Sequence, residues 1–121
     1  MTDIVDVRNY TLRNIETAKA LTSDFKSKIL DFKEMNVGAI QTIVTGADVN
    51  DGSFSLEVSL LCDPTTFITY PGSERSMSLE CSNFGWSLDQ VILSWRYFRV
   101  CYTRGSDTMG AVDIWARGKR T

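Results

Sequence analysis

The sequence of 121 residues contains no histidine. This absence excludes Ser-His-Asp and Cys-His catalysis, zinc sites with imidazole ligands, and the side chain that most often transfers protons near neutral pH. The motifs GxGxxG, GxxxxGK(S/T) and GxSxG, which bind nucleotides or position a nucleophilic serine, are absent as well. We therefore expect no enzymatic activity, no cofactor and no catalytic residue.

The chain has little excess charge and no long apolar run. Thirteen basic and fifteen acidic residues give a formal net charge of −2, whereas a dedicated DNA or RNA binder carries a basic surface. No stretch approaches the roughly eighteen consecutive apolar residues of a membrane span, and the first residues carry acids where a signal peptide needs bases. We therefore expect a protein of a soluble compartment, with no nucleic-acid partner and no membrane.

Cysteine is scarce and unpaired in its spacing. Cys62, Cys81 and Cys101 lie nineteen and twenty residues apart, so no CxxC redox motif or zinc knuckle is present. We expect three reduced and mostly buried thiols. A disulfide between Cys62 and Cys81, or between Cys81 and Cys101, is the alternative.

What the sequence does contain is apolar and polar residues in alternation, which dominates after residue 35. In segment 53–60, Phe54, Leu56, Val58 and Leu60 alternate with polar residues, which is typical of a half-buried strand.

A second strand is expected just before this one. Segment 38–45 is rich in β-branched residues, and the intervening residues 46–52 form a turn cluster that ends in Asp-Gly. The pattern predicts that the two strands form a hairpin. Further strands are expected at residues 22–30, 66–70, 83–88, 95–104 and 110–117.

These segments make about seven or eight short strands separated by Gly, Asp, Pro and Ser, in a chain of ordinary globular composition. They predict an all-β fold: an antiparallel β-sandwich, jelly-roll-like, with little helix. We expect one sandwich domain over residues 22–121 and an N-terminal arm over residues 1–21. Within the arm, residues 12–21 fit a short helix, an extended arm or an edge strand.

The carboxylates fall singly and mostly at turns. Residues 48–52 superficially resemble a calcium-binding loop, but that loop needs Gly at its sixth position and Glu at its twelfth. Here Gly52 is fifth and Ser59 is twelfth, so we expect a turn and no metal. Residues 105–110 lie between two strands and are expected to form a loose hairpin loop rather than a phosphate site.

Several aromatic residues could fill the core or lie on the surface. On a sandwich face, Trp95, Tyr97 or Trp115 could also stack on sugar rings, which makes a glycan-binding module an alternative function. Trp115 is expected to face outward between Asp113 and Arg117, as an anchor of a protein interface does. A pair between Arg99 and Asp113 on neighbouring strands would be the plainer role for those charges.

The last third of the chain carries a family resemblance. The strand Tyr-Phe-Arg-Val-Cys-Tyr-Thr-Arg (97–104), the loop 105–110, the strand 111–114 and the ending Gly-Lys-Arg (118–120) resemble a recurring ending of small virion proteins of tailed bacteriophages. These are similar to β-sandwich head-decoration, or capsid-cement, proteins. The Ile-Gln-x-Ile-Val-Thr-Gly and Phe-x-Leu-x-Val-Ser strands fit in outline, so the resemblance covers roughly residues 22–120.

The resemblance implies a virion protein, assembled in the host cytoplasm, that decorates and stabilises the capsid without catalysis. Its expected partners are the major capsid protein or other virion proteins, and it is expected to form a homo-oligomer, a trimer or dimer. A head-tail connector or tail adaptor, and a glycan-binding module on the virion surface, are the alternatives. The residues expected at the protein interface are Val7, Tyr10, Leu12 and Ile15 in the arm, and Trp115 and Arg117 on the last strand.

Overall fold

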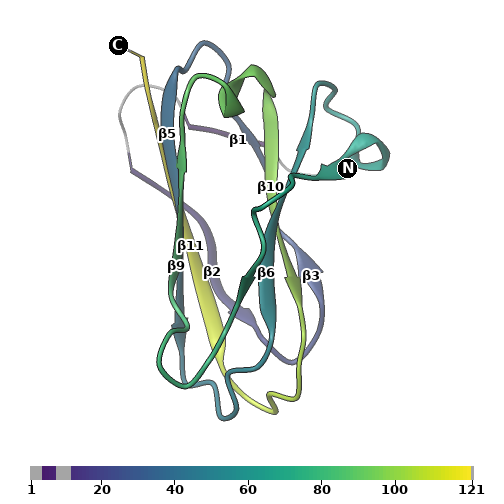
Figure 1. The fold of residues 1–121 in the computed structure, drawn as a ribbon, viewed down its shortest axis with the longest axis vertical. Coiled ribbons are helices and arrows are strands. Elements are labelled where there is room, and N and C mark those ends of the chain that lie inside the picture. The colour runs from purple at the N-terminus through teal and green to yellow at the C-terminus, as the bar shows by residue number, and fades with distance from the viewer. Residues whose placement is uncertain (1–3, 8–11, 121) are drawn as a thin grey trace.

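Two β-sheets lie face to face in the computed structural model, which describes residues 4–7 and 12–120 (Figure 1). One sheet has seven strands and the other has four, and the side chains between them form the core. The helical elements of the described residues are two single 3-10 turns, η1 (Pro64–Thr66) and η2 (Ile92–Ser94). The predicted all-β sandwich is confirmed. None of the helices in this part of the chain has the length and apolar character of a membrane span.

The four-stranded sheet is antiparallel throughout. Its order is β2 (Arg13–Ala20), β11 (Ala111–Lys119), β5 (Val37–Thr45) and β9 (Phe84–Leu88). Along β5, buried and exposed residues alternate almost without interruption, because successive side chains point to opposite faces of a sheet. One face of this sheet therefore covers the core, and the other faces outward.

The seven-stranded sheet is built around β10 (Tyr97–Thr103) and β6 (Ser53–Ser59), two central strands that pair over seven residues. All its pairs are antiparallel except that of β1 with β4. The main path runs through β1 (Ile4–Asp6), β4 (Ile29–Asp31), β10 (Tyr97–Thr103), β6 (Ser53–Ser59) and β7 (Ile68–Thr69), while β3 (Phe25–Lys26) pairs with β10 and β8 (Arg75–Ser76) with β6.

The core is formed by the inward residues of both sheets and is rich in aromatic rings. Phe98 contacts Phe32 edge-on at 5.2 Å between ring centroids, and Phe54 lies 5.0 Å from Tyr102. The Tyr102 hydroxyl is buried and donates a hydrogen bond to the carbonyl oxygen of Leu21 at 3.0 Å. This bond satisfies a polar atom whose burial would otherwise cost free energy.

The predicted hairpin between segments 38–45 and 53–60 is wrong, although both segments are strands. β5 belongs to the four-stranded sheet and β6 to the seven-stranded sheet, so residues 46–52 carry the chain across the sandwich. Loop 104–110 does the same between β10 and β11, and the two loops lie side by side at one end of the molecule (Figure 1). A turn cluster predicts where the chain reverses, but it does not decide which sheet receives the next strand.

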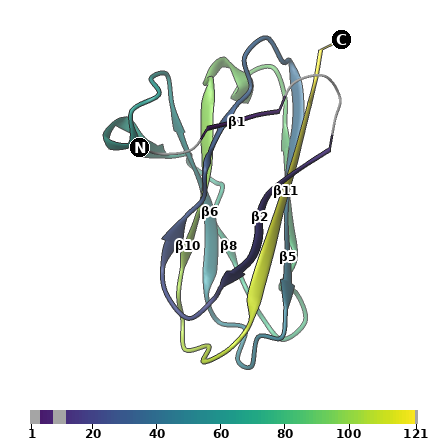
Figure 2. The same ribbon diagram turned by 180° about the vertical axis from the view of Figure 1, so that it is seen from behind.

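The expectation of a separate N-terminal arm is wrong for the described residues, whereas the edge strand, one of the three alternatives for residues 12–21, is the one found. Residues 13–20 form β2, which lies along β11 as an edge of the four-stranded sheet (Figure 2). Val7 and Ile15, both expected at an interface, are buried in the core. Val7 donates its N–H to Asp31 O and accepts a hydrogen bond from Gly118 N. The segment is part of the sandwich because it supplies the strand that pairs with the free edge of β11.

Candidate functional site

A buried arginine organises the outer face of the seven-stranded sheet. Only 7% of Arg99 is exposed, and its Nε donates to Glu57 Oε1 at 2.7 Å. Lys26 Nζ lies 3.1 Å from Oε2 of the same carboxylate. Burial by itself raises the pKa of Glu57, but the hydrogen bonds from Arg99 and Lys26 outweigh it and lower the pKa below its ordinary value. The carboxylate is therefore held ionised as part of the structure.

The expected pair between Arg99 and Asp113 is wrong because β10 and β11 lie in different sheets. Asp113 instead accepts a hydrogen bond from the backbone N–H of Ala18 at 2.7 Å, which ties β11 to β2. The charges of the last two strands thus serve separate local contacts.

Arg99 also holds the segment that follows β6. Its Nη2 donates to the carbonyl oxygen of Pro64 at 3.2 Å, and the guanidinium lies 4.4 Å from the centroid of the Phe67 ring. A planar guanidinium can form hydrogen bonds in its plane and stack an aromatic ring on its face at the same time. Residues 60–67 therefore fold back over the outer face of the sheet in a fixed position.

This segment exposes apolar side chains. Leu60 and Leu61 are each 62% exposed and Ile68 is 52% exposed; they lie near the half-buried Trp95. We call these four residues the apolar patch. They line a concave space of about 440 Å³ together with Ser59 and Thr66.

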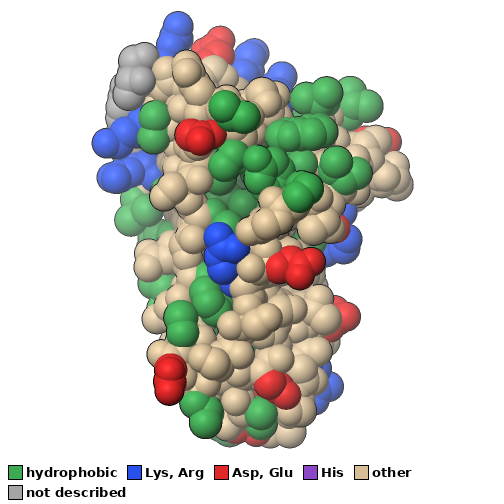
Figure 3. Space-filling model, viewed as in Figure 1, with side chains coloured by type: hydrophobic (Ala, Val, Ile, Leu, Met, Phe, Trp, Pro, Cys, Tyr) green, Lys and Arg blue, Asp and Glu red, His purple; other side chains and the backbone are tan. Residues whose placement is uncertain are grey.

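Hydrophobic side chains gather over this region in the space-filling view (Figure 3). The lining of the concave space includes no charged residue. Scattered apolar residues are normal on a protein surface, whereas a contiguous group around a concavity marks an interaction site.

The sequence did not predict the apolar patch, because alternation places Leu60 with the core residues Phe54, Leu56 and Val58. In the structure β6 ends at Ser59, whose side chain is buried and accepts the backbone N–H of Leu61. The chain therefore turns before Leu60 reaches the core. The adjacent Leu-Leu pair was the available signal, since two consecutive leucines cannot both face the core of a half-buried strand.

The two loops that cross the sandwich are joined by carboxylates. Thr108 donates its N–H and hydroxyl to Asp48 at 2.9 and 2.6 Å, and Ser106 donates the same two groups to Asp51 at 2.7 and 2.5 Å. In return, Asp107 Oδ1 accepts the N–H groups of Val49 and Asn50.

These hydrogen bonds lower the pKa values of the two aspartates that accept them. The hydrogen bonds from Thr108 lower the pKa of Asp48 to about 2, and those from Ser106 lower the pKa of Asp51. Within residues 4–7 and 12–120, no group of three or more His, Cys, Asp or Glu side chains is arranged to hold a metal ion. The aspartates of residues 48–52, which superficially resemble a calcium-binding loop, instead accept hydrogen bonds that hold loop 46–52 to loop 104–110.

The three cysteines differ in their exposure. All three thiols are free, and Cys62 and Cys81 are exposed, so the expectation that most are buried is wrong for these two. Burial raises the pKa of the half-buried Cys101 to about 12, and the neighbouring Glu57 carboxylate contributes to the shift. A thiol with so high a pKa is protonated and unreactive near neutral pH.

The residues expected at an interface separate into three groups. Val7 and Ile15 lie in the core and cannot touch a partner, and Tyr10 lies outside the described residues. Leu12 is 58% exposed and directly precedes Arg13, which pairs with Ala116 on β11.

Trp115 and Arg117 both lie on the outer face of the four-stranded sheet, Trp115 half-buried and Arg117 exposed. The structure thus brings Leu12 close to the strand that carries Trp115 and Arg117. All three lie on or directly beside the four-stranded sheet, whereas Ile68 lies on the seven-stranded sheet and Leu60 directly follows one of its strands.

No protein-family model matches the sequence, and no curated protein matches it significantly. The surfaces of the sandwich and the sequence patterns are therefore what supports a function.

Proposed function

We propose that this protein is a bacteriophage structural protein that decorates the capsid and stabilises it by binding neighbouring capsid subunits. The observation that supports this role is the apolar patch, in which Leu60, Leu61, Ile68 and Trp95 surround one concave space that has no charged residue in its lining. The sequence resemblance of residues 22–120 to head-decoration proteins points in the same direction. No step of the role requires catalysis.

The patch has the properties of a docking surface that is ready before its partner arrives. The contacts of Arg99 with Glu57, Pro64 and Phe67 fix the segment that carries Leu60 and Leu61. A surface that is already ordered loses little conformational entropy on binding.

The contribution of such a surface can be estimated from its side chains. Complete burial of Leu60, Leu61 and Ile68, each more than half exposed in the isolated protein, would contribute on the order of 3–5 kcal/mol before the cost of association. That is modest for a single copy.

A ligand that binds the assembled shell and not its separated subunits stabilises the shell by mass action. Many equivalent sites on a capsid lattice multiply this small contribution. A protein without an active site can therefore stabilise a capsid simply by covering apolar surface where subunits meet.

The proposal is tested by attachment to purified capsid particles of the phage that encodes the protein. The double variant Leu60→Ser/Leu61→Ser should co-sediment with particles at least about tenfold more weakly than the wild type, because it removes two apolar anchors. The matched control is Leu79→Ser, which removes an equally large leucine that is 85% exposed and outside the patch. Equal attachment of the double variant and the wild type would overturn the proposal.

The same preparation distinguishes the neighbouring role. Copies distributed over the whole shell support decoration, whereas a single ring of copies at one vertex supports a head-tail connector.

A further inference from the structure

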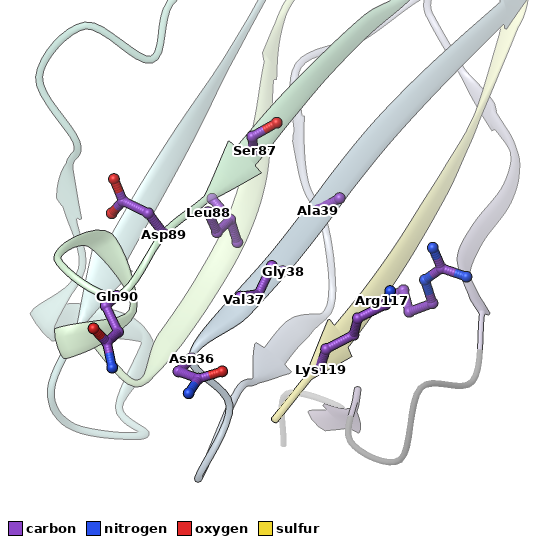
Figure 4. Close-up of a pocket in the computed structure, with 10 residues that line it drawn as sticks. All are labelled: Asn36, Val37, Gly38, Ala39, Ser87, Leu88, Asp89, Gln90, Arg117 and Lys119. Carbon is purple, nitrogen blue, oxygen red and sulfur yellow. The ribbon is translucent and has the colours of Figure 1, made fainter. Parts of the chain in front are cut away.

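The outer face of the four-stranded sheet carries a second concave site. A cavity of about 650 Å³ lies over β9, β5 and β11. Figure 4 shows the residues that line it, which come from all three strands and from the chain next to them. Its small and basic lining residues include Ala39, Ser87, Arg117 and Lys119.

The floor of this site is low because the central residues are small. Ala39 pairs with Ser87 on one side and with Arg117 on the other. In the next row, Gln41 lies between Gly85 and Trp115. Above Gly85 the nearest atom to an added Cβ would be the carbonyl oxygen of Ile40, at 3.8 Å, so nothing fills that space.

Trp115 does not line the cavity itself but lies in the next outward row of the sheet, with Gln41 and Gly85. We call the cavity together with this row the trough. Residues 115, 117 and 119 of β11 all face outward, and outward positions on one strand follow each other at about 7 Å. The indole ring of Trp115 therefore lies one step along the same face from Arg117. A ligand of two linked rings would reach from Trp115 into the cavity.

The trough has an unneutralised basic side. Within the described residues, neither Arg117 nor Lys119 forms an ion pair or a side-chain hydrogen bond. The one acid in the lining, Asp89, already accepts the backbone N–H of Ile92 at 3.0 Å. Two basic side chains thus line the β11 side of the site, whose other polar side chains are the hydrogen-bonded Asp89 carboxylate, one hydroxyl and two amides.

We propose that this trough binds an acidic saccharide. Trp115 presents an aromatic face on which the C–H face of a sugar ring can stack, and Arg117 and Lys119 bind its carboxylate. Gln41 and Ser87 are within the trough and have donors and acceptors for sugar hydroxyls. A shallow site with one aromatic platform and several polar side chains fits a saccharide better than an apolar ligand.

Two other aromatic candidates on the sandwich do not offer such a platform. Tyr97 is 9% exposed and Arg96 covers its ring at 4.8 Å. Trp95 belongs to the apolar patch, where the only polar lining residues are Ser59 and Thr66. The structure thus selects Trp115 among the three aromatic residues that the sequence offered for stacking.

A nucleic acid is the less suitable occupant. Single-stranded nucleic acids bind along grooves with several cations and successive stacking aromatics. Here one Trp and two cations are available on a protein of net charge −2. The trough and the apolar patch lie on different sheets, so this inference does not depend on the proposed attachment to a capsid.

The test is a glycan array that contains sialylated, uronate-containing and neutral oligosaccharides, probed with the full-length protein at about 150 mM salt. Acidic members should bind, and calorimetry with the strongest of them should give at least about tenfold tighter binding than its neutral counterpart. A useful matched pair is 3′-sialyllactose and lactose, which share the same neutral core.

Variants assign the binding to the trough. Trp115→Ala should weaken binding about tenfold or more, whereas Trp95→Ala, in the apolar patch, should leave it unchanged. Arg117→Gln/Lys119→Gln should remove the preference for the acidic sugar while the far-UV circular dichroism stays that of the wild type. Absence of any glycan binding, binding that survives Trp115→Ala, or equally tight binding of a single-stranded oligonucleotide would each overturn the proposal.

Discussion

Arg99 and Glu57 face each other directly across β10 and β6, with Arg99 Nε 2.7 Å from Glu57 Oε1. The pair lies on the outer side of its sheet, yet both side chains are largely buried, and Pro64 and Phe67 of the segment 60–67 contact Arg99. One ion pair therefore connects the stability of the sandwich with the position of the apolar patch.

Replacing this arginine should destabilise the fold and loosen the covering segment. Arg99→Met keeps the aliphatic stem but leaves the Glu57 carboxylate with Lys26 alone, and we expect a loss of about 2–4 kcal/mol in the free energy of unfolding. Urea denaturation measures the loss, and amide hydrogen exchange should become faster in residues 60–67.

Arg96 provides the matched control because it forms a bidentate pair with Asp31 while its side chain remains 41% exposed. Arg96→Met should cost about 1 kcal/mol or less. Equal losses in the two variants, with hydrogen exchange in residues 60–67 unchanged by Arg99→Met, would show that the covering segment does not depend on Arg99.

The N-terminal strand should be essential for folding. Ile15 is buried between the sheets, so Ile15→Ala should destabilise the protein by about 2–5 kcal/mol. Leu12→Ala, three residues earlier and exposed, should change stability by less than about 0.5 kcal/mol. Deletion of residues 1–18 removes β1 and most of β2, and the truncated chain should fail to give a cooperative thermal transition. A truncated chain that unfolds like the wild type would restore the idea of a separate arm.

The hydrogen bonds that join loops 46–52 and 104–110 should make the stability of the protein depend on pH in the acid range. The pKa of Asp48 is about 2 in the folded protein and 3.8 as an ordinary value, so its contribution is present above about pH 4 and is lost as the pH falls towards 2. Asp48→Asn should therefore unfold at lower urea concentration than the wild type at pH 6, and the two should converge near pH 2. Glu80→Gln, which changes an exposed carboxylate outside both loops, should keep the pH dependence of the wild type.

The thiols should differ in reactivity. Cys62 and Cys81 are exposed, whereas Cys101 is half-buried and has a pKa raised to about 12. In the folded protein at pH 8, a disulfide reagent such as dithionitrobenzoate should modify Cys62 and Cys81 rapidly and Cys101 only after unfolding. Mass spectrometry of the peptides that carry the mixed disulfide, digested without reductant, identifies each site, and rapid labelling of Cys101 would contradict the burial described for it.

The sequence predicted the strands better than their partners. Alternation in segments 38–45 and 53–60 marks half-buried strands correctly, because this periodicity is set by the two faces of a sheet. The same alternation and the same turn residues occur both in a hairpin within one sheet and in a connection between two sheets, so they do not distinguish the two. Loop 46–52 is therefore found from its Asp and Gly residues, while its course depends on Asp107 from a distant loop.

The surfaces were harder to predict than the core. Residues 13–20 include only one core-facing hydrophobic residue, Ile15, because the strand is an edge with one buried position. The sequence therefore leaves helix, arm and strand equally open there. Leu60 follows the pattern of β6 but lies beyond its end, and only the capping contact of the Ser59 hydroxyl shows where the strand stops. By contrast, the outward direction of Trp115 follows directly from the alternation of β11.

Electron cryomicroscopy of the phage particle with this protein bound tests the central claim most directly. We expect density for the sandwich at repeated positions on the shell, with Leu60, Leu61 and Ile68 packed against a capsid subunit. We also expect the outer face of the four-stranded sheet, with Trp115, to remain accessible. Absence of the protein from the shell, or attachment that leaves Leu60 and Leu61 in solvent, would contradict the proposed role.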